Sequence, residues 1–183
     1  KLVNSAFYGF PGRIGTITHA VVILGFATIK NIVLTASIFD SFRKKGSNPM
    51  DFDLEKFWYH SIACGAASQC IAKYTGMSER EECFIAGLLH DIGKIKIAEI
   101  IRIPRKLTEK EFNIVKKHPS SGGKIVEGLD GLEMAYDIIM DHHEKWDGSG
   151  YPQGKKGEKI SLAGRIVALV DVFDALVSVR PYK

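Results

Sequence analysis

The sequence predicts an all-α protein, a helical bundle with an N-terminal helical extension. Apolar residues recur at three- and four-residue steps through most of the 183 residues, which is the period of helices packed on a core. Capping residues and glycine or proline breakers separate these stretches. No stretch shows the sustained two-residue alternation of a half-buried strand. Hydrophobic residues make up 45% of the chain and charged residues 25%, which permits a real core.

The first predicted helices precede a charged linker. From Thr16 the apolar positions follow helical spacing, and Gly25 is expected to separate two helices. Residues 43–49, RKKGSNP, are rich in charges and breakers, so we place a boundary there. The chain is therefore divided into a helical segment of residues 1–47 and a core of residues 48–183.

Six helices are expected in the core, and most of them begin at a capping residue. Asp51 or Asp53 can cap the first helix. Capping boxes are expected where Ser78 precedes Glu81 and, by the same logic, at Thr108. The predicted helices run from Asp53 to Gly76, from Ser78 to Gly93, from Thr108 to His118, from Ser121 to Glu127, from Glu133 to His143 and from Ser161 to Ser178.

Charge and cysteine content exclude several classes of protein. The net charge is +4 with 25 cationic and 21 anionic residues, which is too balanced for a surface that coats nucleic acid. A helix-turn-helix over residues 14–42 is disfavoured because the segment offers only Arg13 and Lys30 for DNA. The odd number of cysteines, three, argues against a disulfide framework and favours a cytoplasmic location. We interpret Cys64, Cys70 and Cys83 as core residues.

Two further expectations concern membrane insertion and the extent of the chain. No apolar run reaches the roughly 18 residues that span a bilayer, so no membrane segment is expected. The chain opens at Lys1 in the middle of a helical pattern, without an initiator Met, and is expected to be a fragment of a longer protein.

Histidines and aspartates with metal-ligand chemistry gather in a few short stretches. Residues 90–94 read HDIGK and residues 142–152 read HHEKWDGSGYP. Imidazole and carboxylate are the usual ligands of catalytic Zn, Mn and Fe, and two ions about 3.5–4 Å apart suit the cleavage of phosphate esters. The candidate ligands are His60, His90, Asp91, His118, His142 and His143, together with one of Asp171 and Asp174 on an apolar helix.

The alternatives to metal binding stay open for single residues. His118 can serve as a helix C-cap, and adjacent His142 and His143 point about 100° apart on a helix.

Lys94 is expected to stabilise the charge that develops on phosphoryl oxygens. The joint occurrence of these residues therefore favours a metal-dependent phosphohydrolase.

These motifs also carry a family resemblance over about residues 55–183. HDIGK, His118-Pro119, HHEKWDGSGYP, the run DVFDA at 171–175 and RPYK at 180–183 resemble the HD-GYP branch of the HD phosphohydrolases. The resemblance implies an HD-domain helical bundle and hydrolysis of cyclic di-GMP to pGpG or GMP by a metal-bridged hydroxide. Some relatives act on other cyclic dinucleotides such as cyclic GMP-AMP. Iron or manganese is the expected metal, with zinc, nickel or magnesium as alternatives.

The resemblance also assigns roles to individual residues. It implies that Asp91 bridges two ions and, with Lys94, takes part in catalysis. His60, His90 and Asp171 would complete the first site, and His118, His142 and His143 the second. The implied contacts to the dinucleotide come from Lys94, Gly148, Gly150, Tyr151, Arg180, Tyr182 and Lys183. Trinuclear members carry a Glu four residues before the first His ligand, where this chain has Lys56, so we expect two ions.

The first 45 or so residues resemble a different branch. NSAFYG at 4–9, ITHA at 17–20 and LG at 24–25 are similar to the opening of an HDOD domain, a signalling relative usually without demonstrated catalysis. The alternative function is therefore an HDOD-like, non-catalytic signalling or nucleotide-sensing module. Expected partners are the cyclic dinucleotide and signalling proteins of the GGDEF type, with a homodimer as a further option and no nucleic acid polymer.

Overall fold

A computed structural model describes residues 14–26, 29–30, 32–33, 36–37, 53–101, 103 and 105–178. The chain separates into two compact units, residues 1–45 and residues 46–183. The predicted NSAFYG segment and the linker at 43–49 lie outside the described residues. The assignment of residues 1–47 and 48–183 to two kinds of domain stays a prediction.

The first unit contains helix α1, Ile17–Leu24. The side chain of Thr16 accepts a hydrogen bond from the backbone N–H of His19 at 3.1 Å and so caps the helix. Gly25 ends the helix with φ at +82°, a conformation that favours glycine. The predicted start at Thr16 and the break at Gly25 are both confirmed.

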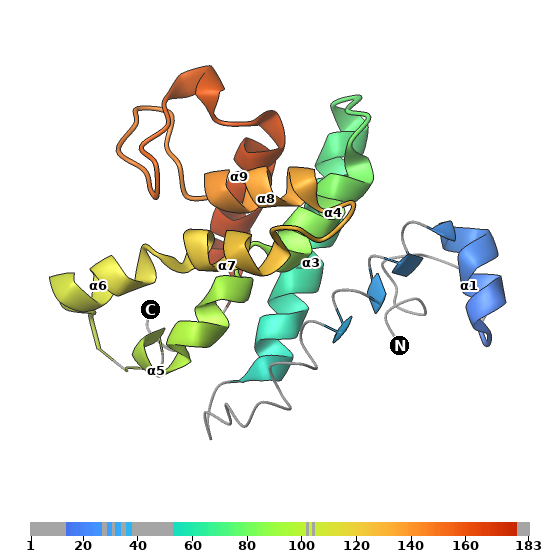
Figure 1. The fold of residues 1–183 in the computed structure, drawn as a ribbon, viewed down its shortest axis with the longest axis horizontal. Helices are drawn as coiled ribbons and strands as arrows, with labels where there is room; N and C mark the ends of the chain where they lie inside the picture. Colours follow the sequence, from blue (N-terminus) through green and yellow to red (C-terminus); the bar gives the residue numbers. More distant parts are fainter. Residues whose placement is uncertain are drawn as a thin grey trace. The chain divides into compact units, whose positions relative to one another are not determined.

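The second unit is built from helices alone among the residues that the structure describes (Figure 1). The predicted all-α class is therefore confirmed. No described helix is both long and apolar enough to cross a bilayer. The elements are α3 (Leu54–Tyr74), α4 (Arg80–Leu89), η3 (Ile92–Ile97), α5 (Ala98–Ile101), α6 (Glu109–Val115), α7 (His118–Val126), α8 (Glu133–Asp141), η4 (Gly157–Lys159) and α9 (Leu162–Val177).

The core of this unit lies where helices α3, α4, α7, α8 and α9 meet. Helix α3 packs along α4 and α9, while α7 packs on α8 and η3, and α8 also contacts α4. Burial of each large apolar side chain stabilises the fold by about 1.5–3 kcal/mol. Fully buried examples from different helices are Phe84, Leu88, Leu89, Ile138, Ile139 and Val167.

Two glycines allow α3 and α4 to cross with their backbones in contact. A Cβ on Gly65 would lie 2.7 Å from the carbonyl oxygen of Phe84, and one on Gly87 would lie 2.8 Å from the Cα of Gly65. Both distances are shorter than real Cβ contacts. This close crossing brings the C-terminal end of α4, and therefore His90, against α3.

The helix caps confirm most of the predicted starts. Asp53 caps α3 by accepting from the N–H of Lys56, Thr108 and Glu111 form a full capping box, and Ser161 caps α9. The box predicted at Ser78 is wrong, because α4 begins at Arg80 with Glu79 as its N-cap. The carboxylate of Glu81 accepts a hydrogen bond from Gln69 Nε2 at 2.8 Å and serves a contact between helices.

The predicted C-terminal end of the helix from Thr108 to His118 is also wrong. Helix α6 ends at Val115, and His118 is the first residue of α7. Pro119 sits at the start of α7, where its missing N–H leaves no hydrogen bond unmade. The proline therefore begins a helix here, and His118 is the first residue of α7, while its Nδ1 lies 2.7 Å from the Val115 carbonyl at the end of α6.

Helix α9 is apolar on more than its buried face. Ala163, Ile166, Val167 and Val170 are buried, but Phe173, Leu176 and Val177 are exposed. Helix α9 is therefore buried along one face of its first half and exposes apolar side chains along its second.

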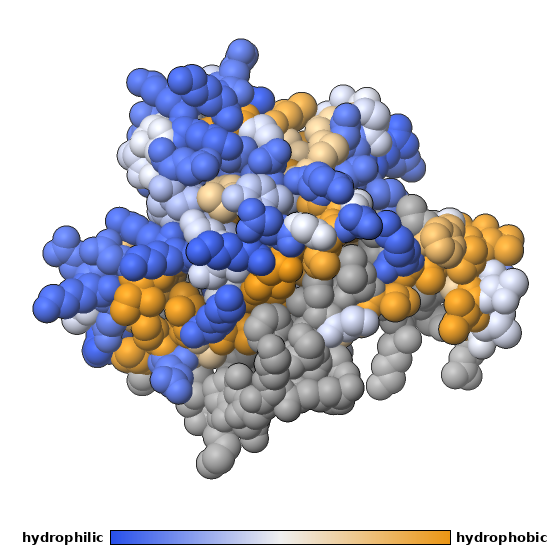
Figure 2. Space-filling model, viewed as in Figure 1, coloured by the Kyte–Doolittle hydropathy of each residue, from blue (hydrophilic) through white to orange (hydrophobic). Residues whose placement is uncertain are grey.

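Figure 2 shows hydrophilic side chains over the loop between α8 and α9 and a hydrophobic area around α5 and α6.

The capping box of α6 predicts a measurable pH dependence. Glu111 accepts hydrogen bonds from Arg105 and from both the N–H and hydroxyl of Thr108, and these contacts lower the pKa of its carboxyl to about 2. A depressed carboxyl pKa contributes stability above the unfolded value, which is lost as the pH falls through the folded value. The melting-temperature difference between the wild type and Glu111→Gln should be constant above pH 4.5 and shrink towards pH 2. A difference that grows on acidification would contradict this assignment.

Candidate metal centre

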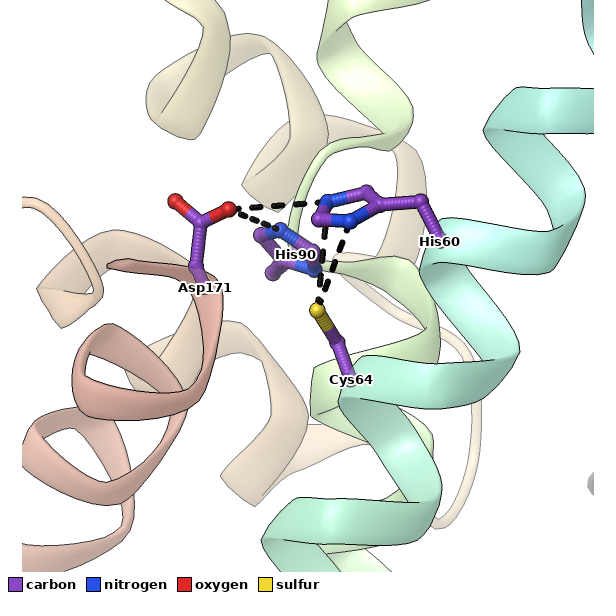
Figure 3. Close-up of side chains that lie close together, drawn as sticks. All are labelled: His60, Cys64, His90 and Asp171. Carbon is purple, nitrogen blue, oxygen red and sulfur yellow. Dashed lines mark hydrogen bonds and ion pairs between the residues drawn. The ribbon is translucent and has the colours of Figure 1, made fainter. Parts of the chain in front are cut away.

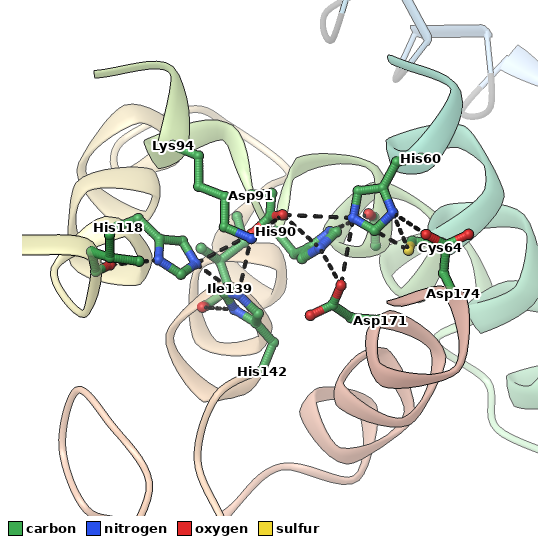
Figure 4. Close-up of polar contacts among 12 residues, drawn as sticks. His60, Cys64, His90, Asp91, Lys94, His118, Ile139, His142, Asp171 and Asp174 are labelled. Carbon is green, nitrogen blue, oxygen red and sulfur yellow. Dashed lines mark hydrogen bonds and ion pairs between the residues drawn. The ribbon is translucent and has the colours of Figure 1, made fainter. Parts of the chain in front are cut away.

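The predicted metal ligands converge from six elements on one buried site (Figure 4). His60 comes from α3, and His90 follows the last residue of α4. Asp91 precedes η3, His118 opens α7, and His142 follows α8. Asp171 joins them from the middle of α9. Residues separated by more than 100 positions in the sequence thus share one site.

Asp91 stands between two sets of imidazoles. Its Oδ2 lies 3.6 Å from His60 Nε2 and 3.4 Å from His90 Nε2. Its Oδ1 lies 3.2 Å from His118 Nε2 and 3.7 Å from His142 Nε2. One carboxylate therefore presents one oxygen to each set, which is the arrangement of a carboxylate that bridges two cations.

Four of these imidazoles are fixed in orientation through their Nδ1 atoms. Nδ1 of His90, His118 and His142 lies 2.6–2.7 Å from the backbone carbonyl three residues earlier in each case. Nδ1 of His60 lies 2.7 Å from Asp174 Oδ2. A carbonyl oxygen can only accept, so Nδ1 of the three former rings carries the hydrogen. Their Nε2 lone pairs therefore point into the site, as in imidazoles that bind metal.

For His90 this lone pair meets no hydrogen-bond donor among the residues that the structure describes. Nε2 of His118 and His142 face each other at 3.2 Å, although in the neutral rings both are acceptors. His90 Nε2 and Asp91 Oδ1 are buried and make no hydrogen bond in the described part of the chain. Unpaired buried acceptors are costly unless a cation meets them. The donor set therefore fits divalent metal ions.

The candidate ligands form two groups of four atoms, each within 4.8 Å of one another. The first ligand group is His60, Cys64, His90 and Asp171. The second ligand group is Asp91, His118, His142 and His143. Every metal ligand predicted from the sequence belongs to one of them.

The surroundings shift the pKa values of the histidines differently in the two ligand groups. Burial disfavours a charged imidazole at His60, but the contacts to Asp91 and Cys64 together outweigh it and raise the pKa to about 10. Burial lowers the pKa of His142 to about 4, and burial together with His142 lowers that of His143 to about 2. Although Asp91 is buried, His90 and Lys94 hold the pKa of its carboxyl well below its usual range. At neutral pH His142 and His143 are thus neutral imidazoles and Asp91 is a carboxylate, the forms that bind metal.

The loop after α8 packs on the second group. The ring of Tyr151 lies 4.8 Å from that of His143, and the Tyr151 N–H donates to the His143 carbonyl at 3.1 Å. A Cβ on Gly150 would lie 2.3 Å from Lys145 N, so only glycine permits this return of the chain. Gly148 has φ at +83° and turns the loop. Three of the predicted substrate-binding residues therefore shape the surroundings of His143.

Lys94 lies beside the bridging carboxylate. Its ammonium is 2.5 Å from Asp91 Oδ2, and its side chain is 20% exposed. It occupies the solvent-facing side of the buried site. Arg180, Tyr182 and Lys183, also predicted to bind substrate, lie outside the described residues.

Sequence reasoning missed two carboxylates that position the site. Asp141 accepts from Lys155 Nζ at 2.6 Å and from Ser161 N at 2.8 Å, which ties the end of α8 to the start of α9. Glu144 accepts from the N–H groups of Gln153 and Gly154, which holds the loop. Their place beside the paired histidines was a signal that could have found them.

The interpretation of Cys64 and Cys83 as core residues is confirmed, but that of Cys70 is wrong, because Cys70 is exposed. The sulfur of Cys64 also lies 3.6 Å from His60 Nδ1, a contact that sequence reasoning did not predict. Asp174, predicted as an alternative to Asp171 as a ligand, fixes the ring of His60. Lys56 stands four residues before His60, and its side chain is 84% exposed. Its Nζ lies 2.9 Å from Asp53 Oδ2 in an ion pair.

Asp174 gives a test of the orientation of His60. Asp174→Asn keeps the shape but removes the charge that holds Nδ1, so metal affinity of the first group should fall about 10-fold, the lower end for such outer contacts. Ser178→Ala is the matched control, because it removes the 3.1 Å bond from Ser178 to Asp174 without touching His60. Metal titration should show the loss in Asp174→Asn alone. Equal affinity in the two variants would contradict the assignment.

Comparisons with known proteins now decide the family. The profile of the HDOD domain matches residues 1–119, well over half of the chain. This chain belongs to the HDOD domain family. The match runs past residue 47 and includes His60, His90, Asp91 and His118, so the HDOD pattern extends into the candidate metal centre.

Several curated proteins similar to this chain are named as cyclic dinucleotide phosphodiesterases. The chain is 48% identical over 118 residues to the cyclic di-GMP phosphodiesterase response regulator RpfG of Xanthomonas campestris, covering 62% of this chain and 31% of the relative. It is 46% identical over 129 residues to a cyclic di-GMP phosphodiesterase of Thermotoga maritima, covering 68% and 35%. It is 34% identical over 140 residues to 3'3'-cGAMP-specific phosphodiesterase 1 of Vibrio cholerae, covering 75% and 32%.

A solved structure shares the fold of this HDOD family member. Bd1817, an HDG"Y"P protein from Bdellovibrio bacteriovorus, matches with a TM-score of 0.61 and 16% identity, over 96% of this chain and 65% of that one. The recognition of an HD-GYP core joined to an HDOD segment is confirmed by these findings. The chain spans about a third of the length of the curated relatives that it matches.

Proposed function

We propose that this chain carries a metal-dependent phosphodiesterase that hydrolyses a cyclic dinucleotide, cyclic di-GMP first, to pGpG and GMP. The observation that carries the proposal is the position of Asp91, whose two oxygens face two separate pairs of imidazoles. A carboxylate that bridges two ions suits in-line displacement at phosphorus. The relatives named as cyclic di-GMP and 3'3'-cGAMP phosphodiesterases support this reaction class.

The proposed ligands divide around Asp91. His60, His90 and Asp171 would hold the first ion, and His118, His142 and His143 the second. Two divalent transition-metal ions are proposed, iron or manganese first, with zinc, nickel or magnesium as alternatives. Bound there, the ions would supply Lewis acidity for the phosphoryl oxygens and would generate the nucleophile from water at neutral pH.

The remaining residues of the site would bind and orient the phosphodiester. Lys94 would leave Asp91 Oδ2 and place its ammonium on a phosphoryl oxygen, where negative charge develops as water attacks phosphorus. The P–O3′ bond would break as the new P–O bond forms, and the 3′ oxygen would take a proton from solvent while the attacking water releases one to solvent. Tyr151, held on His143 by Gly148 and Gly150, would border the dinucleotide. Arg180, Tyr182 and Lys183 are proposed as further contacts to it, since guanidinium and ammonium suit phosphates and an aromatic ring can stack on a base.

A second candidate function follows from the HDOD match over residues 1–119. In this alternative the chain is a signalling module that binds the dinucleotide without cleaving it. Residues 1–47 would then act as an HDOD segment and residues 48–183 as a nucleotide-sensing HD-GYP core. Under either function we propose a cytoplasmic protein with GGDEF-type or other signalling proteins as partners, and a homodimer as one possible assembly.

Product analysis separates the two functions. The metal-loaded chain is incubated with cyclic di-GMP, cyclic GMP-AMP and cyclic di-AMP, with iron, manganese or zinc in separate reactions, and the products are resolved by chromatography. A phosphodiesterase gives linear pGpG or GMP from at least one guanine-containing substrate. Binding with no linear product under any metal would favour the signalling module and overturn the proposed activity.

A further inference from the structure

Cys64 lies one helical turn after His60 on α3, so both side chains point to the same side of the helix. Figure 3 shows the sulfur directed towards the rings of His60 and His90, with Asp171 opposite. The side chain is completely buried. Its surroundings are thus the imidazoles of the first ligand group as well as the apolar core.

The distances match those of ligands that share one ion. Nδ1 of His60 is taken by Asp174, which leaves Nε2 for a metal. The sulfur lies 3.8 Å from this Nε2. With metal–sulfur and metal–nitrogen bonds of about 2.3 and 2.05 Å, two ligands at a tetrahedral angle lie about 3.6 Å apart. All four donor atoms of the first ligand group also lie within 4.8 Å of one another.

His90 provides an independent sign that a ligand belongs here. Its side chain is fully buried, and its Nε2 makes no hydrogen bond in the described residues. The other nitrogen of the ring is fixed on the Gly87 carbonyl at 2.7 Å, so the lone pair of Nε2 is aimed into the group. Such an atom is stabilised by a cation in the space that Cys64 also borders.

Helix packing holds the sulfur at this place. A Cβ on Gly87 would lie 2.9 Å from the carbonyl oxygen of Cys64, so the backbones of α3 and α4 touch at this level. Cys83, by contrast, is equally buried but belongs to neither ligand group. The two cysteines therefore differ in their surroundings and not in their burial.

We propose that the thiolate of Cys64 is a further protein ligand of the ion held by His60, His90 and Asp171, and that it biases this site towards thiophilic metals. Binding exchanges the S–H bond for a sulfur–metal bond and releases one proton to solvent. Sulfur ligands favour zinc, iron and cobalt over magnesium, calcium and manganese. The inference rests on the metal centre of the proposed function, and it adds a ligand and a metal preference to it.

The test uses Co²⁺ as the probe, because a cobalt–thiolate bond gives a charge-transfer band that nitrogen and oxygen ligands do not give. The wild-type chain, Cys64→Ala and Cys83→Ala are loaded with Co²⁺, and bound metal is counted by elemental analysis. Wild type and Cys83→Ala should show the band, and Cys64→Ala should lose it. The affinity of Cys64→Ala for Zn²⁺ should fall at least about 10-fold, the least that even outer partners of a ligand cause. Its affinity for Mn²⁺ should change less.

Each contrary outcome has a distinct meaning. Full cobalt loading without a sulfur band in the wild type, or a band that persists in Cys64→Ala, overturns the Cys64 assignment and leaves the proposed function intact. Absence of metal binding in the wild type overturns both. X-ray absorption of the zinc-loaded wild type is a second measurement that needs no variant. It should find a sulfur shell at about 2.3 Å from zinc, and a shell of nitrogen and oxygen alone would refute the proposal.

Discussion

Replacing Asp91 by asparagine is expected to weaken metal binding at both ligand groups and to abolish turnover. The amide keeps the shape of the side chain, but it removes the charge that faces four imidazoles. A loss of about 4 kcal/mol of transition-state stabilisation corresponds to about a 10³-fold fall in rate. The turnover of cyclic di-GMP and the bound metal per chain should be measured together.

Asp137→Asn provides the control for this substitution. Asp137 is an exposed residue of α8, outside both ligand groups, so the same chemical change should leave metal content and turnover unaltered. Melting curves of both variants establish that the chain is folded. Wild-type metal content and rate in a folded Asp91→Asn chain would refute the bridging role.

Gly93→Ala is expected to have the second large effect, through sterics alone. A Cβ on Gly93 would lie 2.0 Å from the carbonyl oxygen of His118 and 2.8 Å from Gly122 N, and both are backbone atoms. The start of α7 must therefore move away from η3, which should destabilise the chain by roughly 3 kcal/mol. His118 moves with it, so metal affinity of the second ligand group should fall as well.

Gly15→Ala is the matched control, because a Cβ there meets nothing within 4 Å. Thermal unfolding and metal titration of the two variants measure the difference. A Gly93→Ala chain with the melting temperature and metal affinity of Gly15→Ala would show that η3 and α7 are not in contact as described.

Part of the site was predictable from the sequence because His90, Asp91, His142 and His143 lie in two short stretches, HDIGK and HHEKWDGSGYP. HDIGK combines two ligands with a glycine and a lysine, and each of these four residues has a distinct place in the structure. His142 and His143 were predicted as a pair, and both belong to the second ligand group. The all-α class followed from periodicity, which reports the long helices α3 and α9 most directly.

Other features could not be predicted because they depend on contacts between distant residues. The box at Ser78 was predicted from local spacing, but α4 begins at Arg80, and Glu81 takes part in a contact with Gln69 of α3. Pro119 could either end one helix or begin the next, and only the packing of α7 on η3 decides. Cys64 has the same apolar helical context as Cys83, and only the crossing of α3 and α4 places it among imidazoles.

The most direct test of the paired metal centre is product formation measured against the number of metal ions bound per chain. The metal-free chain is titrated with Mn²⁺ or Fe²⁺, and linear product from cyclic di-GMP is quantified at each ratio. We predict no product without metal, and a rate that rises with the second equivalent and reaches its plateau at two ions per chain. A full rate in the metal-free chain, or a plateau at one ion, would contradict the account.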